Sequence, residues 1–252
     1  MKKIILFVFI FFFCFILSCK KNNNSPTGPG NNLLTQGLVA YYPFNDNAND
    51  ESGNGNNGIN HGAVFTNGVC IISGNSGELG SDKYVEIPNF IDGLTQLSIS
   101  IRVKEYNLSF WHGESYISFG SAFADGIGFV SIGHYDYNGT STLHFYTSTK
   151  TSATPLVVSW QDSYSNDFQN YIFIIDGVNG LEKAYMNGSL IESKVISKGP
   201  IYTIVNHAAI GKHWFTGASS TRFNGEIDNV RIYNRVLTDS EIQMLYHEGG
   251  WK

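Results

Sequence analysis

The chain has 252 residues, 42% of them apolar, which is enough for one substantial β-domain with a packed core. Glycine is abundant at 27 residues and proline scarce at 6, a composition that suits short strands joined by tight turns. The formal net charge is −5 and no basic run extends beyond Lys20-Lys21, which argues against a nucleic-acid partner.

The first 18 residues have the pattern of a targeting signal. Lys2 and Lys3 precede an unbroken apolar run, 4–17, which is too short to span a bilayer comfortably and has the length of a signal h-region. The run ends in Ile16-Leu17-Ser18-Cys19, which resembles a bacterial lipobox. We therefore expect cleavage before Cys19, acylation of that cysteine and a lipid anchor in the cell envelope, at the outer membrane or cell surface. The alternative is an ordinary signal peptide with a chance cysteine.

Residues 19–32 form the expected lipidated tether, because "KKNNNSPTGPGNN" is polar, rich in Pro, Gly and Asn, and without a period. Cys14 leaves with the signal and Cys19 carries the lipid, so Cys70 is the one cysteine left in the domain. Without a partner it forms no intramolecular disulfide, and we expect a small buried apolar side chain.

Residues 33–252 show a β pattern. The segment 97–104 alternates strictly, with Leu97, Ile99, Ile101 and Val103 on one face, and further short strands are predicted at 116–119, 127–132, 143–146 and 171–175. Asn187-Gly188 is a strong hairpin signal between 183–186 and 189–192. A dozen or so strands predict an all-β, two-sheet antiparallel sandwich. One short C-terminal helix is expected after the capping box that Thr238 and Glu241 form.

The loop 45–58 is rich in asparagine and glycine and contains two partial motifs. Gly53 to Gly58 fits the letters of the dinucleotide fingerprint, but it follows no long strand and opens no helix, so that interpretation is rejected. Asp50, Ser52 and Asn54 place oxygens at i, i+2 and i+4, as in the opening of a calcium loop, although His61 stands where an EF-hand needs glutamate. The residues alone leave two alternatives open: a calcium-binding cluster, or an Asx-turn loop that satisfies its own backbone.

Aromatic residues in or beside predicted turns are the main hint of a ligand. Sugar rings stack on exposed aromatic faces while neighbouring polar groups bond the hydroxyls, so a glycan site is predicted among them; the alternative is that these rings cap the edges of the core. The candidates are Trp111, Tyr135, Tyr137, Trp160 and Trp214.

Support for catalysis is weak in the sequence. Nucleophile-elbow and zinc-protease motifs are missing, and the seven histidines show no metal-ligand spacing. Glu226 and Asp228 place two carboxylates on one face of a predicted strand, which is how some glycoside hydrolases arrange their catalytic acids.

Several segments resemble, in order, the laminin G-like modules of the concanavalin A-like lectin/glucanase superfamily: "GLVAYYPFNDNANDESGNGNNG", "YVEIP", "LSISIRVK", "AYMNGSLI" and "FNGEIDNVRIYNRVLTDSEIQMLY". The resemblance implies a jelly-roll sandwich whose first and last strands meet. It also implies a structural Ca²⁺ near that junction, with Asp228 joining Asp50, Ser52 and Asn54. Glucanases of the superfamily carry Glu-x-Asp-x-x-Glu on a central strand, whereas Arg231 stands here at the position of the acid, on the final strand.

The sequence therefore predicts a non-catalytic, lipid-anchored cell-envelope module that binds a glycan or cell-surface polysaccharide and is not an enzyme. One alternative is adhesion or scaffolding through protein contacts. Another is an unrecognised polysaccharide hydrolase or lyase on the same sandwich, because this fold hosts all three roles.

Overall fold

The computed structural model describes residues 33–73, 83–106, 114–120, 128–137, 140–148, 153–159, 167–204, 206–213 and 223–248. The signal segment, the tether and Cys19 lie outside the described residues, and so do Trp111, Trp160 and Trp214. Tyr135 and Tyr137 lie on a described strand, but their side chains are not among those described.

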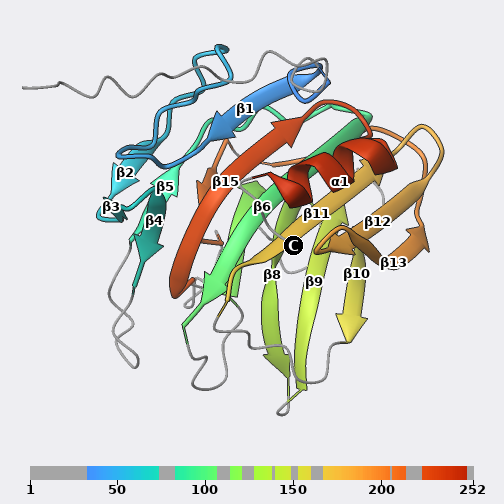
Figure 1. Ribbon diagram of the computed structural model, residues 1–252. Coiled ribbons are helices and arrows are strands. Elements are labelled where there is room, and N and C mark those ends of the chain that lie inside the picture. Colours follow the sequence, from blue (N-terminus) through green and yellow to red (C-terminus); the bar gives the residue numbers. More distant parts are fainter. Residues whose placement is uncertain are drawn as a thin grey trace, which may run out of the picture.

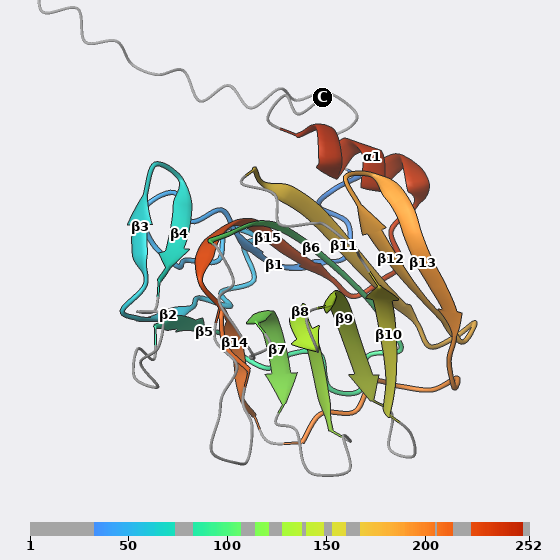
Figure 2. The same ribbon diagram turned by 90° about the horizontal axis from the view of Figure 1, so that it is seen from below.

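Two antiparallel sheets face each other (Figure 1; Figure 2). Sheet A runs in the order β13 (Ser189–Val195), β12 (Leu181–Met186), β11 (Gln169–Asp176), β6 (Gln96–Glu105), β15 (Gly225–Tyr233), β4 (Val69–Ile72) and β3 (Val64–Thr66), and β1 (Leu38–Tyr42) also pairs with β15. Sheet B runs in the order β10 (Ala153–Ser159), β9 (Thr140–Ser148), β8 (Phe129–Tyr137), β7 (Glu114–Gly120), β14 (Ala208–Ile210), β5 (Tyr84–Glu86) and β2 (Ile59–His61). The predicted two-sheet jelly-roll sandwich is confirmed.

Strand β6 shows how alternation builds the core. Its apolar residues lie between the sheets, none more than 2% exposed: Leu97, Ile99, Ile101 and Val103. The intervening side chains point to the outer face of sheet A. Ser98 is buried there because the segment after β15 covers it: its Oγ donates to the Arg235 carbonyl (2.7 Å) and accepts from the Leu237 amide (3.2 Å).

Helix α1 (Asp239–His247) lies on this outer face of sheet A (Figure 1). The predicted capping box is present, since the Thr238 hydroxyl accepts from the Glu241 amide and the Glu241 carboxylate accepts from the Thr238 amide. Ile242 and Leu245 pack into a cluster with Ile172, Ile174, Tyr185, Tyr233 and Leu237. In the part of the chain that the structure describes, no helix is long and apolar enough to cross a membrane.

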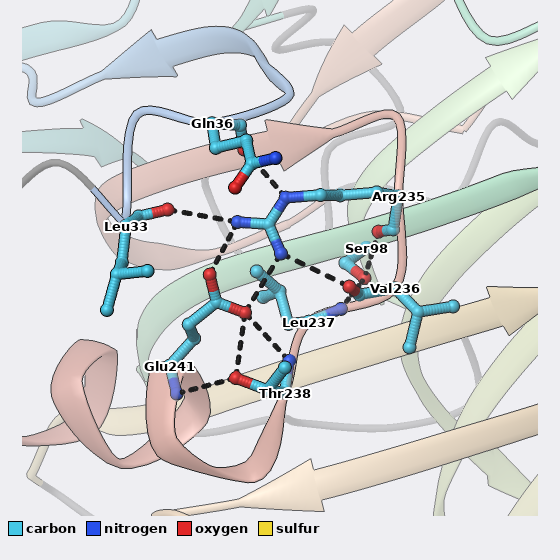
Figure 3. Close-up of polar contacts among 8 residues, drawn as sticks. All are labelled: Leu33, Gln36, Ser98, Arg235, Val236, Leu237, Thr238 and Glu241. Atoms are coloured by element: carbon cyan, nitrogen blue, oxygen red, sulfur yellow. Dashed lines mark hydrogen bonds and ion pairs between the residues drawn. The ribbon is translucent and has the colours of Figure 1, made fainter.

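The start and end of the domain are joined by one arginine (Figure 3). Arg235 donates from Nε to the Gln36 carbonyl (2.7 Å), from Nη2 to the Leu33 carbonyl (3.0 Å), and to both carboxylate oxygens of Glu241 (2.6 and 2.9 Å). The hydrogen bonds from Arg235 are the main reason that the pKa of Glu241 falls to about 2. The expected meeting of the first and last strands is thus confirmed by the β1–β15 pairing and reinforced by this contact.

Candidate functional site

The outer face of sheet B carries a row of side chains that crosses six strands. Val130, Ile132 and Phe145 of the central strands lie in the core, so the residues between them point outward. The strand register aligns the outward row as Ile59, Glu86, Ala209, Ser118, Ser131 and Tyr146. Small residues thus form the middle of the row and larger ones its two ends.

The middle of this row is filled and inaccessible. Ala209, Ser118 and Ser131 are all fully buried, and the Ser118 hydroxyl donates to the Lys212 carbonyl (2.6 Å). The ring of Phe129 lies 5.1 Å from that of His213. A ligand would therefore meet the two ends of the row and not its centre.

At one end, three outward residues of β9 form a hydrogen-bonded line. The Thr142 hydroxyl lies 2.6 Å from His144 Nε2, and His144 Nδ1 lies 2.9 Å from the Tyr146 hydroxyl. The two rings are 5.3 Å apart, and both side chains are half-buried. We call Thr142, His144 and Tyr146 the β9 line.

The β9 line is uncharged at neutral pH. Burial, helped by the nearby imidazole of His134, lowers the pKa of His144 to about 4, and burial also raises the pKa of Tyr146. A neutral imidazole offers one donor and one acceptor nitrogen, and each hydroxyl can play either role. Aromatic faces beside neutral donors and acceptors are what a sugar ring with its hydroxyls requires.

The other end of the row holds a second aromatic group. His61 stacks on Tyr84 with ring centroids 4.3 Å apart, and Lys212 Nζ lies 4.3 Å from the centre of the same Tyr84 ring. His61 Nε2 also lies 2.9 Å from Glu86 Oε2, with both side chains more than a third exposed. This end is charged, in contrast to the β9 line.

A carboxylate, an imidazole and a phenol also meet between the sheets. His134 Nδ1 lies 2.8 Å from Glu105 Oε1 and 2.8 Å from the Tyr116 hydroxyl, and Tyr116 also donates to Glu105. These types could serve in acid–base chemistry, but His134 and Glu105 are only 2% and 7% exposed and Tyr116 is fully buried. The group is therefore a satisfied polar network in the interior.

The predicted calcium loop is held by its own hydrogen bonds. Asp50 Oδ1 accepts from the amides of Tyr41 and Ser52, and Oδ2 accepts from the Ser52 hydroxyl and the Asn56 amide. Burial alone would raise the pKa of Asp50, but these hydrogen bonds outweigh it and the pKa is lowered. Asn54 donates to Ser52 Oγ and to the Leu38 carbonyl. This is the pattern of the Asx-turn alternative, and a cation would have to displace these donors.

Asp228 has other partners. It lies 3.9 Å from Arg102 Nη1 and accepts from Asn229 Nδ2 (2.7 Å), and burial raises its pKa despite the opposing effect of Arg102. Tyr41 lies between the two regions, since its amide binds Asp50 and its hydroxyl donates to Asn229. Among the described residues, no group of three His, Cys, Asp or Glu side chains is arranged to hold a metal. Calcium at Asp50, Ser52, Asn54 and Asp228 stays a prediction.

The two carboxylates of β15 each face a cation of β6. Glu226 Oε1 lies 3.1 Å from Lys104 Nζ and also accepts from the Tyr106 hydroxyl, while Asp228 lies opposite Arg102. Arg231, at the position of the glucanase acid, stacks 3.9 Å over the Tyr41 ring and pairs with Glu248. These contacts hold β15 to its neighbours in the interior of sheet A.

The fold defines a class of protein, the two-sheet antiparallel sandwich. The chain belongs to the concanavalin A-like lectin/glucanases superfamily, whose family model matches residues 79–243. No curated protein matches the chain.

Solved structures share the fold. Domain 4 of AbnA, a GH43 extracellular arabinanase from Geobacillus stearothermophilus in complex with arabinotriose, superposes with a TM-score of 0.61 and 21% identity, covering 83% of this chain and 98% of that one. The binding domain of Botulinum neurotoxin DC, in complex with rat synaptotagmin II, gives 0.62 and 16%, covering 84% of this chain and 52% of that one. The binding domain of Paraclostridial Mosquitocidal Protein 1 gives 0.60 and 18%, covering 85% and 52%. At these identities the likeness shows the fold alone.

The sequence pattern predicts a strand at 143–146, but the β9 line is not among the residues predicted to bind a ligand. The signal was present, because in "LHFY" the residues Leu143 and Phe145 take the core side and leave His144 and Tyr146 on the other. The five aromatic residues that it did single out have side chains outside the described part of the structure.

Proposed function

We propose that this protein is a non-catalytic, lipid-anchored module of the cell envelope that binds carbohydrate through the outer face of sheet B. The β9 line carries the proposal, because His144 and Tyr146 offer half-buried rings side by side, with the neutral hydroxyls of Thr142 and Tyr146 at the two ends of the line. The arabinotriose complex of a structural neighbour supports a sugar ligand on this fold. The lipobox-like Ile16-Leu17-Ser18-Cys19 supports the anchor.

Binding without cleavage is favoured by the carboxylates of the described residues. Retaining and inverting glycosidases both need two carboxyl groups that flank one bond. Here Glu226 and Asp228 face cations on sheet A, and Glu105 lies between the sheets. Glu86 lies on β5 at the charged end of the row, with β14, β7 and β8 between it and the β9 line.

A glycan array followed by calorimetry tests this proposal. Affinity should be weak, roughly micromolar to millimolar, because an exposed sugar buries little apolar area and exchanges water hydrogen bonds for protein ones. Tyr146→Ala should weaken binding at least about tenfold, since stacking and a hydrogen bond are both lost. Tyr246→Ala is the matched control, because Tyr246 is another half-buried tyrosine beside a histidine, His247, but lies on α1 across the molecule.

Chromatography of the polysaccharides after incubation separates binding from cleavage. We expect unchanged chains. New reducing ends or unsaturated fragments would overturn the non-catalytic assignment, and an absence of binding to every glycan tested would favour a protein partner instead.

A further inference from the structure

Strand β13 forms an edge of sheet A (Figure 1) and, in the described part of the chain, pairs with β12 alone. Two of its apolar side chains are strongly exposed, Leu190 at 53% and Val195 at 77%. Val195 has the largest exposed fraction of any large apolar residue described. An exposed, apolar sheet edge is a template for pairing with another strand.

The sequence of this edge is a palindrome of residue classes: serine, apolar and charged residues follow in the same order from either end. Residues 189–197 are "SLIESKVIS", centred on Ser193. An antiparallel pairing of two copies about Ser193 places Glu192 opposite Lys194 of the second copy, and Lys194 opposite Glu192. The ends of the segment then match apolar with apolar and serine with serine.

The faces of the strand agree with this register. Leu190, Ser193 and Val195 lie opposite Tyr185, Lys183 and Leu181 of β12, so they share the face of the sheet on which α1 lies. Glu192 and Leu190 of β13 lie opposite Ala184 and Tyr185 of β12. A β-bulge between them therefore leaves Ile191 as an extra residue with no opposite residue on β12. In the register about Ser193, Val195 lies opposite the extra residue Ile191 of the second copy. Glu192 and Lys194, which lie opposite Ala184 and Glu182 of β12, form their pairs on the other face of the strand.

The backbone of the edge is in position for such pairing. The Ile196 amide donates inward to the Gly180 carbonyl (3.0 Å), whereas the Ser193 amide donates to the side chain of its own neighbour, Glu192 Oε1 (2.9 Å). Since the Ser193 amide does not join the ladder with β12, it can exchange N–H···O=C bonds with Ser193 of a second copy.

We propose that two copies of this protein associate through β13, antiparallel and centred on Ser193, so that sheet A continues from one copy into the next. This interface is independent of the proposed glycan site, which lies on sheet B. Its consequence for that site is avidity, because a dimer presents two β9 lines to one polysaccharide and can bind it more tightly than either site alone.

Charge reversal with rescue tests the register. Sedimentation of the purified protein over a range of concentrations should show a monomer–dimer equilibrium. Glu192→Lys and Lys194→Glu each create two like-charge pairs and should weaken the dimer about tenfold or more. The double variant Glu192→Lys/Lys194→Glu restores opposite charges and should return the dissociation constant to near that of the wild type. Lys198→Glu, the same charge change outside the paired segment, should leave it unchanged.

Charged side chains on an exposed edge strand also serve to prevent association between monomers. The charge-reversal experiment distinguishes that role from the proposed pairing of Glu192 with Lys194. A protein that sediments as a monomer at every concentration, or a double variant no better associated than the single ones, would overturn the proposal. Lys194 also lowers the pKa of Glu182, so the melting temperature of each variant is measured alongside. Glu192→Lys carries the test without changing a residue that acts on Glu182.

Discussion

The hydroxyl of Thr147 on β9 donates a hydrogen bond to the carboxyl group of Glu182 on β12, across the interior of the sandwich. Both side chains are buried, and Glu182 is fully so. Burial raises the pKa of Glu182 to about 8, against the smaller opposing effect of Lys194. At neutral pH this glutamic acid is therefore mostly protonated, in contact with the core.

The protonation of Glu182 makes stability fall as pH rises. The unfolded chain ionises this group near its ordinary value of 4.5, and the folded chain only near 8, so the favourable contribution is complete below about pH 4.5 and is lost by about pH 8. Glu182→Gln should abolish this loss, which has an upper bound of roughly 5 kcal/mol at 1.36 kcal/mol per pKa unit. Denaturant unfolding at pH 5 and pH 8.5 measures it. Glu192→Gln, on the exposed neighbouring strand, is the control, and parallel pH profiles for all three proteins would refute the assignment.

The glycan affinity should not change between about pH 5.5 and 8, because burial holds the pKa of His144 near 4 and keeps the β9 line neutral throughout. Below about pH 4 the imidazole gains a proton, so the Thr142 or Tyr146 hydroxyl that donates to it must reorient, and binding should weaken. Calorimetric titrations across this range test the point. A transition centred near the ordinary histidine value of about 6.5 would contradict this prediction, since a neutral His144 with a lowered pKa does not titrate there.

Calcium, if bound at the loop, should raise the melting temperature by mass action, and chelation should reverse the rise. Asp50→Ala lowers stability with or without the ion, because four hydrogen bonds to its carboxylate are lost. The informative quantity is therefore the calcium-induced shift, which should vanish in Asp50→Ala and Asp228→Ala. Equal melting of wild-type protein in calcium and in chelator would leave the loop as an Asx turn only.

The predicted lipidation would depend on one sulfur atom, that of Cys19. Cys19→Ala should abolish incorporation of a fatty-acid probe and leave the protein either unprocessed or released in soluble form. Cys14→Ala, within the apolar run, is the control and should label like the wild type. Labelling of Cys19→Ala at the wild-type level would exclude Cys19 as the acceptor.

Local patterns in the sequence determined much of the fold. The alternation of 97–104 fixed which side of β6 is buried, Asn187-Gly188 fixed the β12–β13 turn, with positive φ at both residues, and Thr238 with Glu241 fixed the start of α1. Each signal acts within a few residues, since steric limits on the backbone and hydrogen bonds near in sequence decide it.

Beyond the β12–β13 hairpin and the meeting of the first and last strands, only the tertiary structure decided which strands pair, and with them the surroundings of each polar group. The spacing of Glu226 and Asp228 shows only that both carboxylates lie on one face of a strand, and the pairing of β15 with β6 places Lys104 and Arg102 opposite them. Glu182 is buried because sheet B covers it, and β9 places Thr147 against its carboxyl group. The pKa of such a group depends on burial and on neighbours that include residues more than 30 positions away in the chain. A local sequence pattern does not show which of these residues come into contact.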